Sequence, residues 1–313
     1  MNTTSEKRFS ILLCIDGSEE SFRGLRYAVR VGKGNDADIT LLFVRPVDLD
    51  RESDGLDLNL MRKNMLEWGF ELPGMQHLEQ ARALLIEMGY MNDKWKTTTV
   101  NREVIGDPLG DNMVVYTSDT GAQIILKLMV SPSIARGILD ECELNAYDIT
   151  IIAMQDKSET AARGSINWNV TRTVVTEHRG VVLLAREIEE NHGHLICVTH
   201  DEKSIAAAQK DAIMASRCNC PVHLLSVAPT KEDIPAAELS INLARNSIEQ
   251  AGVKVVDATV AMGDPVKEII ERGKPFSVIV MADSDVKGLR RFFQTSVTYE
   301  VLKKAYNSVM VMR

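Results

Sequence analysis

An internal repeat constrains the fold of this chain more than any other feature of its sequence. Residues 10–46 recur at 193–229 with a constant offset of 183, without a gap. Residues 149–186 recur at 276–313 with an offset of 127. A repeat of this length is one structural unit used twice, so the chain contains two copies of one domain.

The two offsets differ by 56 residues, so the first copy is longer than the second. We predict domains at 1–190 and 191–313, with an insertion in the first between residues 47 and 121. The part at 47–73 predicts an amphipathic helix, because Leu58, Met61, Met65 and Trp68 recur at helical spacing. The part at 93–121 has strand-like runs around Gly and Pro and predicts a hairpin. The Met-rich face is either a partner surface or a cover for the domain's own sheet, and we favour the cover.

Each copy alternates short apolar runs with helical patterns. Residues 11–15 predict a strand that is buried on both faces, and Ser18 followed by two glutamates predicts the start of a helix. The expected third strand of the first copy is 124–130. The expected elements of the second copy are strand 222–227, helix 232–251, strand 253–261, helix 265–272, strand 277–282, helix 295–305 and strand 308–312. The pattern predicts two tandem flavodoxin-like α/β domains, each with a doubly wound, five-stranded parallel sheet.

Composition excludes several classes of function. The net charge of −8 and the aromatic content of 5% disfavour a nucleic-acid-binding role. The longest apolar runs are too short to span a bilayer, and we expect no signal peptide. Five cysteines without a framework spacing indicate a reducing compartment. We therefore expect a cytoplasmic protein that binds neither nucleic acid nor membrane.

Cysteine and histidine residues form two further candidate clusters. Cys218, Cys220 and His223 place three potential metal or redox ligands within six residues. A structural zinc site needs a fourth ligand, so we interpret them as ordinary residues of a turn before a strand and predict no metal site. His192 and His194 lie at the junction of the copies and are interpreted as a solvated linker. Cys14 and Cys197 occupy matching strand positions and are expected to be buried core thiols.

The repeat unit resembles the universal stress protein domain, and the whole chain resembles a tandem member of that family. The resemblance rests on Asp16-Gly17-Ser18 after the first strand, Val44-Arg45-Pro46 and Gly263-Asp264-Pro265. It rests also on the run from Gly288 to Val297, followed by a helix and a last apolar strand. It covers both copies outside the insertion.

The resemblance implies a site for ATP. Family members that bind ATP place an acidic residue after the first strand and a G-x-x-G-x9-G-[S/T] loop after the fourth. Glycines let backbone N–H groups approach phosphates, and a hydroxyl at a helix N-terminus completes the anion site. The candidate nucleotide-binding positions of this chain are Asp16, Val44, Val227, Gly263, Asp264, Lys287, Gly288, Arg290, Thr295 and Ser296.

Both copies depart from this pattern. In the second copy the glycine positions hold Ala282, Asp285 and Thr295, and the acidic position holds Thr199; Ser296 keeps the hydroxyl. Asp283 and Asp285 would repel a triphosphate, and Lys287, Arg290 and Arg291 would offset part of that repulsion. The first copy keeps Asp16, but its loop positions hold Gln155, Ser158, Trp168 and Asn169, and Ser131-Pro132-Ser133 stands where the second copy has Gly-Asp-Pro. As local alternatives, Asp16 serves a turn, Gly263 supplies a turn and Ser296 caps a helix.

These departures predict a non-enzymatic stress-response protein that acts through protein contacts, with degenerate nucleotide sites and no bound cofactor. The alternative is an ATP-binding regulator, at most a weak ATPase, that uses Mg-ATP in the second copy. A third hypothesis is a small-molecule site between the copies for a ligand other than ATP. No catalytic residue is predicted.

The resemblance also implies how the copies associate. Family domains commonly pair through their last strands, which here are residues 181–185 and 308–312. Such a pair would cover two apolar edges within one chain and form an intramolecular pseudo-dimer. We also expect a homodimer of chains and an unidentified protein partner.

Overall fold

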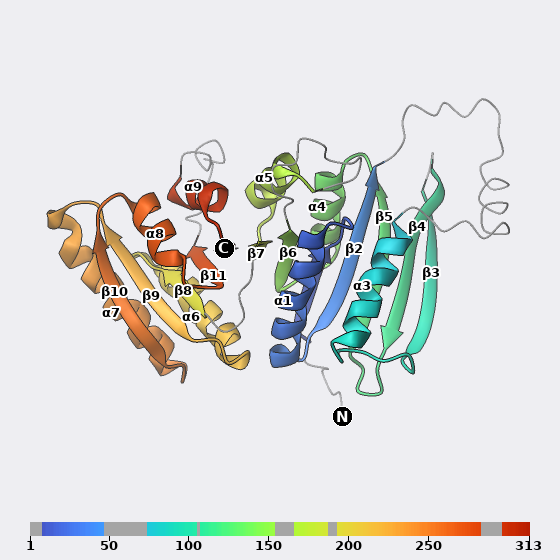
Figure 1. Cartoon of the computed structure of the whole chain (residues 1–313), viewed down its shortest axis with the longest axis horizontal. Helices are drawn as coiled ribbons and strands as arrows, with labels where there is room; N and C mark the ends of the chain where they lie inside the picture. Colours follow the sequence, from blue (N-terminus) through green and yellow to red (C-terminus); the bar gives the residue numbers. More distant parts are fainter. Residues whose placement is uncertain (1–7, 47–73, 105–106, 154–165, 187–192, 283–295) are drawn as a thin grey trace. The chain divides into compact units, whose positions relative to one another are not determined.

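The computed structural model describes residues 8–46, 74–104, 107–153, 166–186, 193–282 and 296–313. The chain divides into two compact units (Figure 1). Unit 1 comprises residues 1–32 and 36–177, and unit 2 comprises residues 33–35 and 178–313. Within the described part of the chain, no helix is both long and apolar enough to cross a membrane.

Unit 2 contains the parallel sheet expected for the second copy. Its strands run in the order β10-β9-β8-β11-β12 and are all parallel. The elements are β8 (His194–Cys197), α6 (Glu202–Arg217), β9 (Val222–Ala228), α7 (Ile234–Gln250), β10 (Val255–Met262), α8 (Pro265–Gly273), β11 (Val278–Ala282), α9 (Val297–Lys304) and β12 (Ser308–Met312). A short 3-10 turn, Lys231–Asp233, precedes α7. The order of the strands reverses between β8 and β11, as in doubly wound folds.

A sixth strand joins unit 2 from the end of the first repeat. Strand β7 (Val182–Ala185) pairs antiparallel with β12, with Leu183 opposite Met310. The guanidinium of Arg186 donates to the carbonyl oxygens of Leu302 and Ala305, at 2.5 and 2.6 Å. The predicted pairing of the two last strands is therefore confirmed.

Unit 1 contains a similar parallel sheet, but of four strands and not the predicted five, because β7 pairs in unit 2; two antiparallel strands extend it. Its sheet order is β6-β1-β2-β5-β4-β3. Strands β6, β1, β2 and β5 pair in parallel, and β4 pairs antiparallel with both β5 and β3. The elements are β1 (Ser10–Cys14), α1 (Glu19–Asn35), β2 (Asp38–Pro46), α3 (Met75–Glu87), β3 (Lys96–Val104), β4 (Asp107–Thr117), β5 (Gln123–Ser131), α4 (Ile134–Leu144), β6 (Ile149–Ala153) and α5 (Trp168–Glu177). The hairpin predicted at 93–121 and the strand predicted at 124–130 are confirmed. The helix predicted at 47–73 lies outside the described residues.

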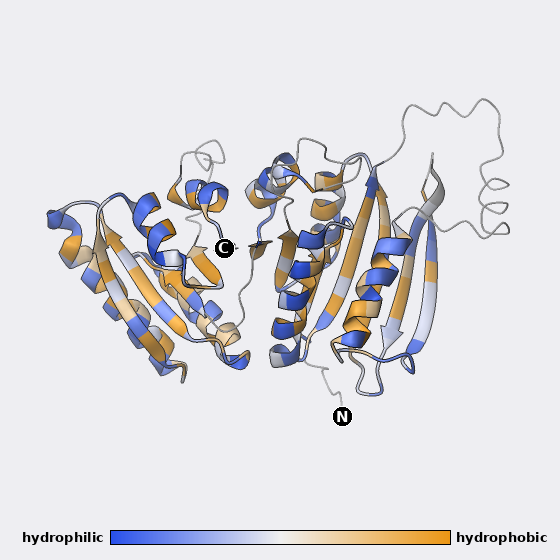
Figure 2. Cartoon of the chain, viewed as in Figure 1, coloured by the Kyte–Doolittle hydropathy of each residue, from blue (hydrophilic) through white to orange (hydrophobic). Residues whose placement is uncertain are grey.

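The apolar runs become strands because helices cover both faces of each sheet. Ile11, Leu12 and Leu13 are fully buried, and every residue of β6 and β12 is buried. Apolar residues follow the strands and the inward faces of the helices (Figure 2). Burial of one such side chain stabilises the fold by about 1.5–3 kcal/mol, so these runs define the core.

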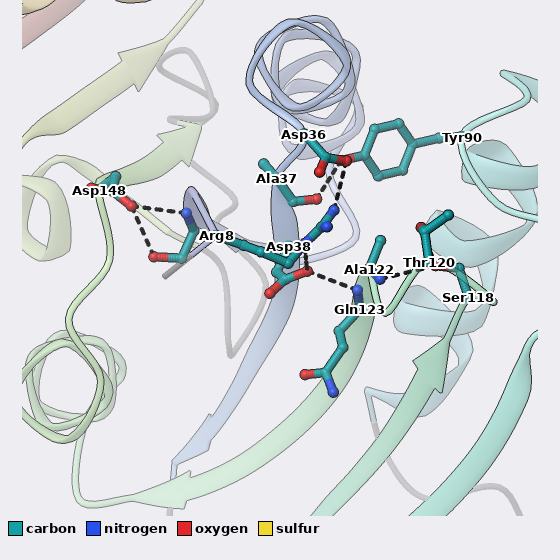
Figure 3. A network of polar contacts seen from close by, with 11 residues as sticks. Arg8, Asp36, Ala37, Asp38, Tyr90, Ser118, Thr120, Ala122, Gln123 and Asp148 are labelled. Carbon is teal, nitrogen blue, oxygen red and sulfur yellow. Dashed lines mark hydrogen bonds and ion pairs between the residues drawn. The ribbon is translucent and has the colours of Figure 1, made fainter. Parts of the chain in front are cut away.

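A polar network fixes the edge of the unit 1 sheet at which the parallel strands begin (Figure 3). The Arg8 guanidinium lies 2.6 Å from Asp36 Oδ1 and 3.1 Å from Asp38 Oδ1. Asp38 Oδ1 also accepts from the backbone N–H of Gln123, at 2.8 Å, and so ties the start of β2 to the start of β5. The Tyr90 hydroxyl donates to the carbonyl oxygen of Ala37 at 2.7 Å. The candidate site lies at the opposite edge of the sheet, where the parallel strands end.

Candidate functional site

The predicted site residues gather where the parallel strands of each sheet end, an edge called here the carboxyl edge. In a doubly wound fold ligands bind outside this edge, near the point where the strand order reverses. In unit 2, Thr199 follows β8, Val227 lies near the end of β9, Gly263 follows β10 and Ser296 precedes α9. The positions Lys287, Gly288, Arg290 and Thr295 lie outside the described residues, as do Asp283, Asp285 and Arg291.

Thr199 and Asp201 form a closed cluster after β8. Asp201 caps α6, since its Oδ1 accepts from the backbone N–H of Ser204 at 2.9 Å, and the Thr199 hydroxyl donates to its Oδ2. The Ser204 hydroxyl accepts from the backbone N–H of Thr199 at 2.9 Å. Burial alone would raise the pKa of Asp201, but the Thr199 and Ser204 hydrogen bonds outweigh it and lower that pKa. Asp201 therefore carries a negative charge at neutral pH.

Gly263 and Asp264 form the turn between β10 and α8. Gly263 has φ +145°, a conformation that favours glycine, and its N–H donates to the carbonyl of Ala228 at 3.0 Å. Asp264 caps α8 by accepting from the backbone N–H of Lys267 at 2.9 Å, and Pro265 occupies the first turn. The local role proposed for Gly263 from the sequence is confirmed.

Ser296 caps α9, as its local interpretation predicted. Its hydroxyl accepts from the backbone N–H of Tyr299 at 3.1 Å. The carboxyl edge of unit 2 therefore presents helices α6 and α8 with carboxylate caps and α9 with a hydroxyl cap. Carboxylates at helix N-termini offset the positive end of the helix dipole, so an anionic ligand is disfavoured beside Asp201 and Asp264.

In unit 1 the carboxylate of Asp16 is held by hydrogen bonds within the chain. Its Oδ1 accepts from the backbone N–H and the hydroxyl of Ser18, at 3.0 and 2.5 Å. Its Oδ2 accepts from the backbone N–H of Ile166 at 2.8 Å. Ser18 in turn caps α1, since its hydroxyl accepts from the N–H of Ser21 at 3.2 Å. The turn role predicted for Asp16 is confirmed, and both carboxylate oxygens accept hydrogen bonds from the chain.

The side chain of His77 lies against Gly17, a contact that the sequence did not indicate. Gly17 has φ +83°, and a Cβ atom added there would lie less than 3.0 Å from the His77 ring. The same ring stacks on Phe43 of β2, with ring centroids 5.7 Å apart and an interplanar angle of 20°. Helix α3 thus contacts the loop that follows β1, where the resemblance places the acidic residue of a nucleotide site.

The remaining unit 1 positions serve packing and capping. Val44 is buried and lies close against Gly137 of α4. Ser133 caps α4 by accepting from the N–H of Arg136 at 3.2 Å. Trp168 is the half-buried first residue of α5, and Asn167 before it accepts from the backbone N–H groups of Asn169 and Val170. The helix caps at this edge are therefore uncharged.

The cysteine and histidine clusters differ from the sequence interpretation. His194 is buried in β8, so its assignment to a solvated linker is wrong; His192 lies outside the described residues. The Cys220 thiol donates to the carbonyl oxygen of Cys218 at 3.8 Å, and the ring of His223 packs edge-on against Phe276 at 4.9 Å. Cys14 is buried as predicted, whereas Cys197 is half-buried. Among the described residues, no group of three or more His, Cys, Asp or Glu side chains is arranged to hold a metal ion.

Comparison with known proteins agrees with the fold and the repeat. Residues 8–81 match the model of the universal stress protein family. The first repeat is therefore similar to the universal stress protein domain over about a quarter of the chain. Its fold is similar to that of a universal stress protein from Archaeoglobus fulgidus DSM 4304, at 16% identity over 97% of this chain and 96% of that chain, with a TM-score of 0.58. A putative universal stress protein from Pseudomonas aeruginosa UCBPP-PA14 gives 12% identity over 97% and 92%, with a TM-score of 0.61.

The two structural matches extend through both units, which agrees with two universal stress protein folds in tandem. At these identities the similarity establishes the fold and leaves the site to this chain's own residues. The comparison with curated proteins gives no match.

Proposed function

We propose that this chain is a universal stress protein that acts in the cytoplasm through protein contacts, without catalysis, and that its nucleotide sites are degenerate. The observation that carries the proposal is the occupied carboxyl edge of unit 1. The Asp16 carboxylate accepts three hydrogen bonds from its own chain, and the His77 ring lies against Gly17. A nucleotide base placed there would have to displace both groups.

The charge at the carboxyl edge of unit 2 supports the same conclusion. Thr199 stands where the family has an acidic residue, and its hydroxyl is bonded to Asp201. Asp201 and Asp264 cap two of the helices that begin there. A triphosphate beside two carboxylates would meet repulsion of order 1–4 kcal/mol per close pair. ATP with Mg²⁺ at this edge, held by the segment before Ser296, is the second candidate function.

The antiparallel extension of unit 1 supports a role in protein contacts. Strand β3 pairs with β4 on one side and is the edge strand of the unit 1 sheet. Its residues 96–102 are exposed, and they include three consecutive threonines and Val100. An edge strand offers backbone N–H and C=O groups to an added strand, so β3 can take up an extended segment of a partner.

The β7–β12 pair supports the proposal that the two repeats form an intramolecular pseudo-dimer, because it joins the last strands of the two copies by backbone hydrogen bonds. We further propose that two chains associate as a homodimer. Light scattering on the purified chain tests the second proposal, which a monomer at micromolar concentration would contradict.

Survival of stressed cells, measured for four kinds of variant, separates the two candidate functions. Ser296→Ala removes the cap hydroxyl of α9, and Ser133→Ala removes the matched cap of α4 in unit 1. Each is expected to cost about 0.5–2 kcal/mol of stability and to leave cellular activity intact. Deletion of 47–73 or disruption of β3 is expected to abolish it. Loss of activity in Ser296→Ala alone would favour the nucleotide-binding regulator.

A further inference from the structure

Strand β10 is an edge strand of the unit 2 sheet. Among the described residues it pairs with β9 on one side and with no strand on the other. The corresponding strand of unit 1 is β5, because each of the two pairs in parallel with the second strand of its copy. In unit 1 the antiparallel strand β4 covers the far side of β5, with Asn112 opposite Leu128. The edge that unit 1 covers with its own hairpin is therefore open in unit 2.

The backbone groups that face this open edge belong to alternate residues of β10. The N–H of Gly263 donates to the carbonyl of Ala228 of β9, at 3.0 Å. The register with β9 shifts near the start of β10 and is unbroken from residue 257 to residue 262. Successive residues of a strand point their N–H and C=O groups to opposite sides. The N–H and C=O groups that face away from β9 are therefore those of Ala258, Val260 and Met262.

Unit 1 shows what this side of the strand binds. Val130 of β5 corresponds to Met262, because Val130 pairs with Arg45 and Met262 pairs with Ala228, its counterpart in the repeat. The N–H of Val130 faces outward and donates to Oδ1 of Asp111, a residue of β4, at 2.7 Å. In unit 1 the outward backbone groups of this strand are therefore used by an added antiparallel strand.

The side chains of β10 suit an antiparallel pair with a second copy of the same strand. Val256 and Met262 are 55% and 52% exposed, and they lie symmetrically in the sequence about Thr259. A two-fold pairing centred on Thr259 brings Val256 near Met262 of the other copy and Thr259 opposite its own counterpart. Asp257, the charged residue of the strand, comes opposite Ala261. Apolar and Thr–Thr pairs across strands are favourable, and no like charges meet.

Charges beyond the two ends of β10 complement one another in the same arrangement. Lys254 precedes the strand and Asp264 follows it, and both are exposed. They are equally far from Thr259 along the sequence. The two-fold pairing therefore directs each Lys254 ammonium toward the Asp264 carboxylate of the other copy. Complementary charges across an interface fix its register, so they favour this pairing over one shifted along the strand.

We propose that two copies of this chain associate through antiparallel pairing of their β10 strands, about a two-fold axis at Thr259. The inference rests on the homodimer proposed above and assigns its interface. Ala258 of each copy exchanges two backbone hydrogen bonds with Val260 of the other. The contact is isologous, so it closes as a dimer, and it covers an edge that is open in the single chain.

The first test is a cross-link that depends on the register. Thr259 faces its counterpart in a non-hydrogen-bonded pair, where the Cα atoms lie about 4.5 Å apart, a separation that a disulfide spans. Thr259→Cys in the full-length chain, under mild oxidation, is expected to give a disulfide-linked dimer on a non-reducing gel. Asp257→Cys is the matched control, because in this register it comes opposite Ala261 and not opposite its own counterpart. The wild-type chain measures the background from the five native cysteines. Equal cross-linking of the two variants would overturn the proposal.

The second test weakens the pair by charge. Thr259→Lys places two ammonium groups opposite each other and should raise the Kd of the dimer at least roughly tenfold, measured by concentration-dependent light scattering. Thr98→Lys is the control, because it adds the same charge to an exposed residue of β3, the edge strand of unit 1, and should leave the Kd unchanged. Circular dichroism checks that both variants fold. Weakening by Thr98→Lys alone would place the interface at β3 and overturn the proposal.

The tests separate the interface from the homodimer itself. A wild-type dimer that Thr259→Lys does not weaken, and that Thr259→Cys does not cross-link, would overturn the β10 interface and leave the homodimer standing. A wild-type monomer at micromolar concentration would overturn both.

Discussion

The His77 ring occupies the space into which a side chain on Gly17 would project, and it stacks on Phe43 of the adjacent strand. This relationship joins helix α3 to the loop that follows β1. In the universal stress protein fold that loop borders the expected nucleotide site. The space beside Gly17 is therefore filled by the protein's own His77 side chain.

Substitution of Gly17 tests this contact. Gly17→Ala adds a Cβ atom that meets the His77 ring, in a backbone conformation with φ +83°. Gly121→Ala is the matched control, because Gly121 has φ +86° and nothing within 4 Å of its Cβ position. Urea unfolding should show a loss of about 1 kcal/mol for the control and about 2–4 kcal/mol for Gly17→Ala. Equal losses would show that His77 moves away without cost.

A buried ion pair in unit 1 predicts a large loss of stability when its carboxylate is removed. Glu141 is 1% exposed, and it accepts hydrogen bonds from Lys127 Nζ at 2.5 Å and from the Tyr147 hydroxyl at 2.6 Å. Glu141→Ala would leave the half-buried Lys127 ammonium without this partner and should cost about 3–5 kcal/mol.

The control for this prediction is an ion pair at the surface. Glu271 and Lys274 form a pair at 2.6 Å, with side chains 55% and 50% exposed. Glu271→Ala should lower the stability far less than Glu141→Ala, because water screens the pair. Stability is measured by thermal unfolding. Comparable losses of stability in the two variants would contradict the conclusion that the buried Glu141 carboxylate stabilises unit 1.

The His194–Asp211 pair predicts that unit 2 loses stability in alkali. The pKa of His194 is about 10 in the folded chain, whereas the ordinary value of 6.5 applies once the chain unfolds. A raised pKa means that the folded state holds the proton more tightly. The stabilisation is therefore complete below about pH 6.5 and is lost as the pH rises toward 10. The free energy of unfolding should fall by about 1–3 kcal/mol between pH 7 and 10, and Asp211→Asn should flatten that fall. An unchanged slope in the variant would contradict the assignment.

The sequence predicted the sheets well because their strands are apolar runs buried on both faces. The strand predicted at 308–312 has those bounds in the structure, and helix 265–272 differs by one residue. The pairing of β7 with β12 was predicted from the resemblance, and it covers the apolar edge strand of each copy.

Contacts between distant residues could not be predicted in this way. His77 and Gly17 are brought together by the packing of α3. The sequence shows a helical spacing there but does not show what the helix packs against. Cys220 was grouped with His223 because they are close in sequence. In the structure, however, Cys220 lies before β9, and the ring of His223 packs against Phe276. The buried His194 of β8 pairs instead with Asp211 of α6, which lies 17 residues away in the sequence.

The nucleotide content of the purified chain tests the central claim most directly. Freshly purified full-length protein is denatured and extracted, any released nucleotide is identified by chromatography and mass, and the native protein is titrated calorimetrically with Mg-ATP. The degenerate sites predict an empty extract and no heat of binding. A stoichiometric amount of ATP or a related nucleotide in the extract would contradict this account and establish that one carboxyl edge still binds its ligand.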